Sequence, residues 1–121
     1  MWRQRIRSFK YAFQGVSYLL RSQPNARIHL AATVMVVLLG FWLAVDRTEW
    51  CLLTLCVGLV FGAEALNTSL EELTNLVSPD HHPLAGRAKD TAAAGVLFLA
   101  GAAAVTGGII FIPKLYHLLF L

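Results

Sequence analysis

Three polar side chains lie at helical spacing within an otherwise apolar stretch of the sequence. Glu64, Asn67 and Glu71 follow one another at intervals of three and four residues, which places them on one face of a helix over two turns. Ionisable side chains are costly inside a membrane span, so they usually face the interior of a helix bundle or a functional site. We therefore take these three residues as a candidate site, and a polar seam that holds helices together is the alternative.

The residue types suggest a particular chemistry. A carboxylate at the boundary of a membrane can act as a general base, and a second carboxylate nearer to water can hold Mg²⁺ together with substrate phosphates. A base beside a metal ligand suggests phosphoryl transfer. The segment 78–90 adds His81, His82, Arg87, Lys89 and Asp90, whose charges and donors suit a polyphosphate. Basic residues there are also expected from membrane topology alone.

Long uncharged runs must position these side chains. Of the 121 residues, 57% are hydrophobic and only 14% are charged, which is unlike a soluble domain. We expect a single membrane domain over 1–121, all-α, with transmembrane helices at 28–45, 50–77 and 91–112. Pro79 and Pro83 predict a loop over 78–90 between the second and third spans. The third run ends at Pro113.

The segment 1–22 has a different pattern. Aromatic and aliphatic residues recur at steps of three and four, and basic residues occupy another face, which predicts an amphipathic helix lying on the membrane surface. Packing of this helix on protein is the alternative. Eight of the ten Lys and Arg residues lie before the first span or in 78–90. The positive-inside rule then predicts a multi-pass protein of the inner (plasma) membrane, with a cytoplasmic N-terminus and a cytoplasmic active site.

Several common signatures are absent from the sequence. There is no GxxxxGK[ST] motif, no GxGxxG motif and no protein-kinase HRD or DFG motif, so ATP binding would need another scaffold. Cys51 and Cys56, the two cysteines, lie five residues apart inside an apolar run and suggest neither a disulfide framework nor a metal site.

Two motifs resemble those of a known family. The stretch Glu-Ala-Leu-Asn-Thr-Ser-Leu-Glu at 64–71 and the stretch Ser-Pro-Asp-His-His-Pro-Leu-Ala-Gly-Arg-Ala-Lys-Asp at 78–90 resemble the prokaryotic diacylglycerol kinase and undecaprenol kinase family. The resemblance extends over nearly the whole chain. It implies a homotrimer of three-span subunits that binds ATP with Mg²⁺ at the cytoplasmic surface and phosphorylates a lipid alcohol from the bilayer.

The resemblance also implies roles for individual residues. Glu64 falls on the catalytic base and, together with Ala93, on the lipid-binding positions, while Asn67 falls on a polar residue of the active site. Glu71 and Gln23 fall on the two positions that bind the metal and ATP. The remaining ATP-contacting positions are Tyr11, Asp80, His81, His82, Lys89 and Asp90.

One departure from the family pattern concerns the metal. The family usually has a glutamate where this chain has Gln23, and a neutral amide binds Mg²⁺ more weakly than a carboxylate. A catalytically degenerate kinase is therefore one alternative, and a small proton- or cation-coupled transporter built around Glu64 is another. The segment around Asn25, Arg27 and His29 is closer to the undecaprenol kinase branch, which favours a polyprenol over diacylglycerol.

Overall fold

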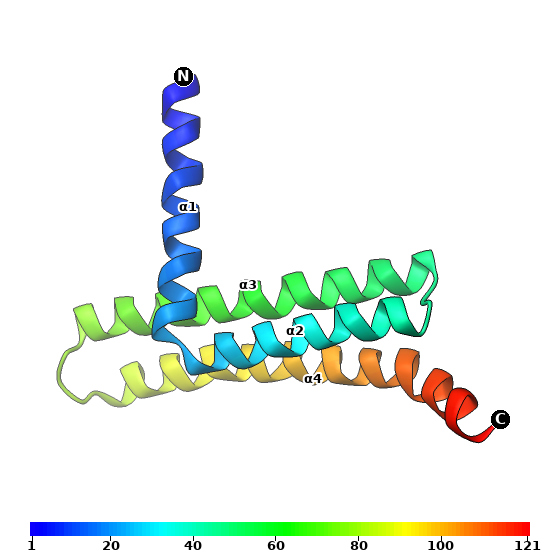
Figure 1. Cartoon of the computed structure of the whole chain (residues 1–121). Helices are drawn as coiled ribbons and strands as arrows, with labels where there is room; N and C mark the ends of the chain where they lie inside the picture. Colours follow the sequence, from blue (N-terminus) through cyan, green and yellow to red (C-terminus); the bar gives the residue numbers. More distant parts are fainter.

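The chain folds into four helices without any strand. The computed structural model describes all 121 residues, as α1 (Trp2–Ser22), α2 (Pro24–Trp42), α3 (Arg47–Val77) and α4 (Pro83–Phe120). Figure 1 shows α2, α3 and α4 side by side, with α1 running across their direction. α3 and α4 form the most extensive pair, α2 packs on α3, and α1 contacts both α2 and α3. The expected all-α architecture is confirmed.

Three of the helices are long and apolar enough to cross a membrane, namely α2, α3 and α4. The 19 residues of α2 correspond to a length of about 28 Å, close to the thickness of the hydrocarbon layer. α2 begins at Pro24, earlier than the expected residue 28, because proline is well suited to the first turn of a helix. It ends at Trp42, and the turn that follows includes Ala44 in the left-handed region with φ of 51°.

The second long helix begins before the expected residue 50. Asp46 caps α3: its side chain accepts a hydrogen bond from the Glu49 amide at 2.8 Å, and the Glu49 carboxylate accepts one from the Asp46 amide at 3.0 Å. This reciprocal arrangement satisfies amide groups that have no partner within the helix. The helix therefore starts at Arg47.

The expected loop over 78–90 is shorter in the structure. α4 begins at Pro83, so only the residues between Val77 and Pro83 lie outside the helices. His82 caps this helix, since its Nδ1 accepts a hydrogen bond from the Leu84 amide at 3.1 Å. Proline at the first helical position costs no hydrogen bond. Lys89 and Asp90 are therefore carried by a helix and not by a flexible connection.

The helix that contains the third expected span continues past residue 112. Pro113 lies inside α4, which ends only at Phe120. Proline lacks an amide hydrogen and leaves one carbonyl of the preceding turn free, an interruption that membrane helices tolerate. In Figure 1 the last turns of α4 bend away from the bundle, as expected near an internal proline.

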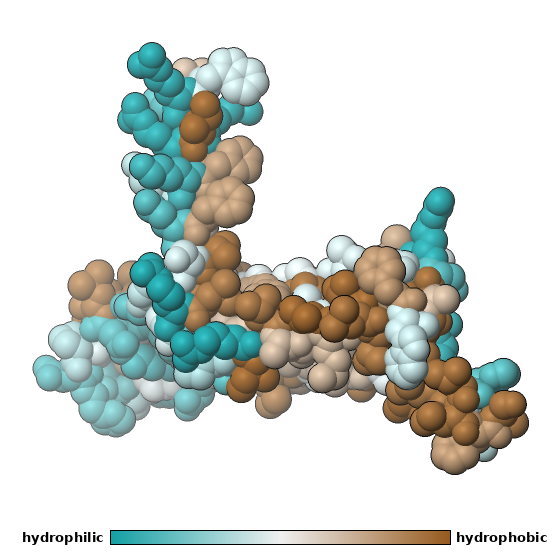
Figure 2. All heavy atoms as spheres, in the orientation of Figure 1, coloured by the Kyte–Doolittle hydropathy of each residue, from teal (hydrophilic) through white to brown (hydrophobic).

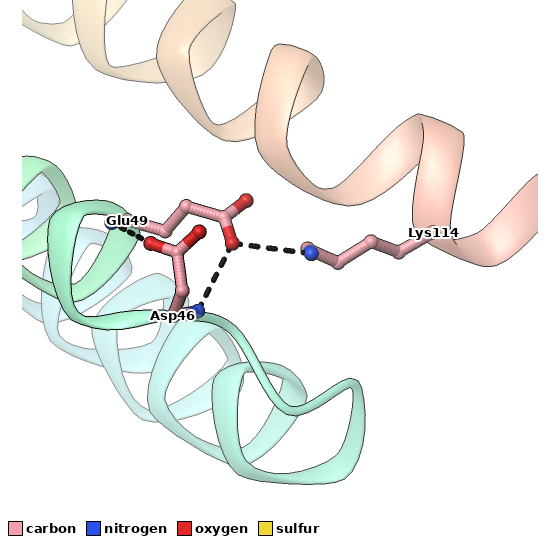
Figure 3. A network of polar contacts seen from close by, with 3 residues as sticks. All are labelled: Asp46, Glu49 and Lys114. Atoms are coloured by element: carbon pink, nitrogen blue, oxygen red, sulfur yellow. Dashed lines mark hydrogen bonds and ion pairs between the residues drawn. The ribbon is translucent and has the colours of Figure 1, made fainter.

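The core lies at the end of the bundle that holds the turn between α2 and α3. Four buried residues form it: Val45, Leu53, Ile110 and Phe111. Beside this core, Lys114 Nζ lies 3.1 Å from Glu49 Oε1 and ties α4 to the capped start of α3, as Figure 3 shows. This end of the bundle is thus held together by apolar packing and by an ion pair.

The amphipathic pattern of α1 is visible in three dimensions. In Figure 2, hydrophobic atoms follow one side of α1 and hydrophilic atoms follow the other. The hydrophobic side faces the same way as the apolar length of the bundle, while the hydrophilic side faces the end that holds the turn between α3 and α4. This is the arrangement that a helix at a membrane surface requires.

Candidate active site

The most deeply buried large side chain of the protein is a carboxylate. Glu64 is 1% exposed, whereas only ten of the 121 residues are buried at all. Its Oε1 has no hydrogen-bond partner, and neither have the buried Asn67 Oδ1 and Thr68 Oγ1 next to it. Buried polar atoms nearly always have partners. Three such atoms within little more than one turn of α3 therefore indicate a place where a ligand or another chain supplies them.

A histidine from α2 faces this carboxylate. His29 Nε2 lies 3.4 Å from Glu64 Oε1, and the side chain of His29 is 22% exposed. The imidazole also meets the ring of Phe61 edge to face, with 6.5 Å between the ring centres. The contact is an ion pair when His29 is protonated, and a modest rotation would make it a hydrogen bond.

Glu64 lines a cavity between α2 and α4. This cavity of about 320 Å³, which we call the α2–α4 cavity, is lined by eight residues: Asn25, Ile28, His29, Glu64, Ala93, Val96, Leu97 and Ala100. Ala93 and Glu64 thus lie in one cavity, as the resemblance implies for the two lipid-binding positions. Their roles stay predictions.

A second, more apolar space adjoins the α2–α4 cavity. This inner groove has a volume of about 330 Å³ and extends between α2, α3 and α4 as far as Val36, Leu53 and Gly107. The two spaces share His29 and Ala100. His29 thus lies between the two spaces, while Glu64 lines only the α2–α4 cavity, whose other walls are mostly apolar. A polar group beside apolar walls is a suitable arrangement for a hydroxyl group attached to a hydrocarbon chain.

Two turns along α3, the second carboxylate of the sequence motif has a different environment. Glu71 is half-buried, and its neighbour Glu72 is exposed and accepts a hydrogen bond from the Tyr18 hydroxyl of α1. Because the Glu72 carboxylate accepts this hydrogen bond and repels a negative tyrosinate, the pKa of Tyr18 is raised above its usual value. α1 is thus tied to α3 one residue away from Glu71.

The other expected ATP-binding residues are dispersed. Gln23 is half-buried at the junction of α1 and α2, and Lys89 is half-buried on α4. Five are exposed, namely Tyr11 on α1, Asp80 and His81 in the turn, His82 at the start of α4, and Asp90 on α4. No hydrogen bond or ion pair joins any of them to Glu71. The structure therefore brings Glu64, Asn67 and Ala93 together but does not gather the ATP-binding set within one chain.

The donors available for a metal are few. No group of three or more His, Cys, Asp and Glu side chains comes together as a metal site. Mg²⁺ is commonly held by one or two carboxylates together with substrate phosphates and water. Glu71 and Gln23 are both half-buried, and Glu71 forms no ion pair within the chain. Their role as metal ligands stays a prediction.

Sequence reasoning alone did not find two of these residues. The sequence presents His29 only as part of the segment that resembles the undecaprenol kinase branch. A polar residue near the start of a span is nevertheless a recognisable signal of a functional site. Tyr18 has no such signal, because its partner Glu72 lies 54 positions away and only the packing of α1 on α3 brings the two together.

The fold and the site together define a class of helical membrane protein in which a buried carboxylate faces a cavity between two spans. Within that class, a sequence profile of the prokaryotic diacylglycerol kinases matches residues 10–111. The chain belongs to this family and is a lipid kinase.

Relatives with curated names agree with the profile. The undecaprenol kinase of Bacillus subtilis is 38% identical over 91% of this chain and 89% of its own length. The diacylglycerol kinase of Synechocystis is 41% identical over 93% of this chain, which spans 65% of that protein. The diacylglycerol kinase of Escherichia coli K12 is 31% identical over 84% of this chain and 83% of its own length.

Proposed function

We propose that this chain transfers the γ-phosphoryl group of ATP to the primary hydroxyl of undecaprenol, with diacylglycerol as the alternative acceptor. One observation supports this proposal above the others: the buried Glu64 carboxylate, whose Oε1 accepts no hydrogen bond, lines a cavity that adjoins an apolar groove. A lipid alcohol has the matching form, a single hydroxyl at the end of a long apolar body.

In the proposed reaction, the lipid hydroxyl enters the α2–α4 cavity and gives its proton to the Glu64 carboxylate. The lipid oxygen bonds to the γ-phosphorus while the bond from that phosphorus to the bridging oxygen breaks, and ADP leaves. Asn67 supplies a polar contact within the site, and Ala93 leaves room for the lipid headgroup. Water is kept away from the base because Glu64 is 1% exposed.

The nucleotide is proposed to bind beyond Glu71, toward the turn between α3 and α4. Lys89 would neutralise charge on the phosphates, assisted by Tyr11, Asp80, His81, His82 and Asp90. Mg²⁺ would be held by Glu71 and Gln23, and when bound it would offset negative charge on the transferred group.

We place this site on the cytoplasmic side of the inner membrane. The amphipathic α1 and the excess of basic residues before the first span and at the start of α4 support this orientation. ATP is then available on the side where the proposed nucleotide site opens.

We also propose a homotrimer, in line with the family resemblance. Leu73 and Leu76 of α3 are 56% and 79% exposed, and they lie beyond the point where Glu72 meets α1. On the side of α1 that faces away from the bilayer, lipid tails cannot cover these leucines. A second copy of the chain could cover them instead. The unpartnered polar atoms near Glu64 and the dispersed ATP-binding residues also favour a site completed by a neighbouring copy.

The choice between lipids rests on the sequence. The segment around Asn25, Arg27 and His29 is closer to the undecaprenol kinase branch, whereas overall identity to the two named classes is similar, at 38% and 41%. Apolar contacts discriminate weakly between chains, so we expect a preference and not complete exclusion.

The test is phosphoryl transfer from γ-labelled ATP by purified protein in mixed micelles, with undecaprenol and diacylglycerol in parallel and Mg²⁺ varied. Faster labelling of undecaprenol supports the proposal, and faster labelling of diacylglycerol assigns the alternative acceptor. No product from either lipid, with folding confirmed by circular dichroism, would overturn the proposal. That result would favour a degenerate kinase or, where a pH gradient drives uptake into liposomes without ATP, a transporter.

A further inference from the structure

The deep burial of Glu64 creates a difficulty for its proposed role. A base that takes a proton from the lipid must release it before the next turnover, and Glu64 is 1% exposed. On α3, its neighbours Asn67 and Thr68 do not accept a second proton at neutral pH. On α4, the cavity is lined by Ala93, Val96, Leu97 and Ala100, none of which titrates. Within one chain, α2 supplies the titratable side chain, other than Glu64 itself, that lines this cavity.

His29 is the one titratable side chain that α2 places there. Its Nε2 lies 3.4 Å from Glu64 Oε1, and its side chain is 22% exposed, so the ring reaches the surface of the bundle near the start of α2. Phe61 packs edge to face against the imidazole and limits its movement. Histidine is the side chain best able both to accept and to release a proton near neutral pH.

We propose that His29 is a positioning residue that orients the Glu64 carboxylate and carries its proton out of the site. This inference rests on the proposed function, because it requires Glu64 to act as the base. It goes beyond that function by assigning a role to a residue of α2 that does not touch the reacting atoms.

The proton balance is simple. Glu64 receives the lipid hydroxyl proton and becomes a neutral acid, and it then passes that proton to the free Nε2 of a neutral His29. The imidazolium then releases its Nδ1 proton to water that reaches the start of α2, and a change of tautomer restores the starting state. The net result is one proton moved from the lipid to solvent for each phosphoryl group transferred.

The test compares two substitutions of His29 with one matched control. His29→Gln keeps a hydrogen-bonding group of similar size but cannot relay a proton, whereas His29→Gly leaves space for added imidazole. His117→Gln removes the same side chain from the far end of α4, where it is exposed. For each protein, kcat and KM for lipid and for ATP are measured with and without imidazole, and ATP binding is measured separately.

We expect His29→Gln to lower kcat by about 100-fold, within the range of a lost proton-transfer group. KM for ATP and ATP binding stay unchanged, and His117→Gln keeps the kcat of the unsubstituted protein. Imidazole raises the kcat of His29→Gly several-fold but leaves that of His29→Gln unchanged, which a merely structural role would not produce.

Unchanged kcat in His29→Gln would overturn the inference, and so would a His29→Gly protein that binds ATP but does not respond to imidazole. Failure of the proposed function is recognised separately. In that case the unsubstituted protein labels no lipid, or Glu64→Gln remains active, whatever His29 does.

Discussion

At the scale of single residues, the decisive feature is a buried carboxylate with one oxygen that accepts no hydrogen bond. Burial of a polar group without a hydrogen bond costs free energy, and that cost must be balanced by function or by assembly. Glu64, Asn67 and Thr68 concentrate this cost on one segment of α3. The rest of that segment is held by ordinary helical hydrogen bonds, so the cost belongs to the site and not to the fold.

The first prediction concerns the base itself. Glu64→Gln keeps the size and polarity of the side chain but removes its ability to accept a proton, so kcat for lipid phosphorylation should fall by about 10²- to 10⁴-fold. ATP binding should persist, measured by titration with a fluorescent nucleotide. Glu49→Gln is the control, because Glu49 lies at the opposite end of the bundle beside Lys114. A Glu64→Gln protein with normal turnover would remove Glu64 from the mechanism.

The second prediction concerns the metal. Gln23→Glu adds a carboxylate at the junction of α1 and α2, and the Mg²⁺ concentration for half-maximal activity should then fall by roughly tenfold. The measurement is a Mg²⁺ titration of activity at fixed ATP. Gln14→Glu, on the exposed length of α1, adds the same charge away from the junction and should leave the titration unchanged. If both variants behave alike, Gln23 is not a metal position.

At the scale of elements, one side-chain hydrogen bond joins the surface helix α1 to the spans. It connects two residues that are 54 positions apart in the sequence. The Tyr18 hydroxyl donates to Glu72, and the pKa of Tyr18 is raised, first because Glu72 accepts this hydrogen bond and second because its charge repels tyrosinate. The folded pKa therefore lies above the unfolded value. The contribution of this contact to stability is complete below about pH 10, the usual tyrosine pKa, and is lost as the pH rises through the raised value.

This sign gives the third prediction. Glu72→Gln should shift the ionisation of Tyr18 back toward lower pH, as measured by the ultraviolet absorbance of tyrosinate, with Tyr18→Phe used to subtract Tyr11 and Tyr116. In the unsubstituted protein, the yield of chemical cross-links between α1 and α3 should fall only at strongly alkaline pH, where Tyr18 loses its proton. An identical titration of Tyr18 in the Glu72→Gln protein would show that the contact is not formed.

The far end of the bundle allows the contribution of a cap to be compared with that of an ion pair. Asp46→Ala removes the cap of α3 and should destabilise the protein by about 1 kcal/mol. Lys114→Met breaks a partly exposed ion pair with Glu49 and should cost less, about 0.5 kcal/mol. Thermal or denaturant unfolding in detergent measures both, and a larger loss in Lys114→Met would contradict this order.

Elements and site differ in how far the sequence predicts them. Hydrophobic runs indicate the three long helices, because a span needs about twenty apolar residues whatever it packs against. Their ends depend on local hydrogen bonds such as those of Asp46 and His82, and on the tolerance for Pro113, so α3 and α4 begin earlier than the uncharged runs and α4 ends later. Spacing along one helix brought Glu64 and Asn67 into the candidate site. Contacts between helices, such as His29 with Glu64, depend on packing that no spacing reveals.

At the scale of the whole molecule, a single chain buries very little of itself. Ten of 121 residues are buried, and large apolar side chains are exposed along every helix. Lipid tails cover such residues within the bilayer, but Leu73 and Leu76 of α3 lie beyond the contact with the surface helix. Exposed apolar surface in water marks a site of protein association. The half of the bundle that holds the candidate site is thus also the half where we propose contact with a second copy.

The last prediction follows from this coincidence of site and exposed leucines. Replacing Leu73 and Leu76 together by glutamine should dissociate the proposed homotrimer, because polar amides remove the gain from covering apolar surface. Native mass spectrometry in detergent should then show monomers, and lipid phosphorylation should fall with the fraction of trimer. Leu121→Gln, at the exposed C-terminal end, should change neither. If the double variant remains trimeric and active, copies associate through other surfaces and the leucines serve another contact. If it becomes monomeric and stays fully active, one chain completes the site, and the unpartnered atoms around Glu64 are satisfied by substrate alone.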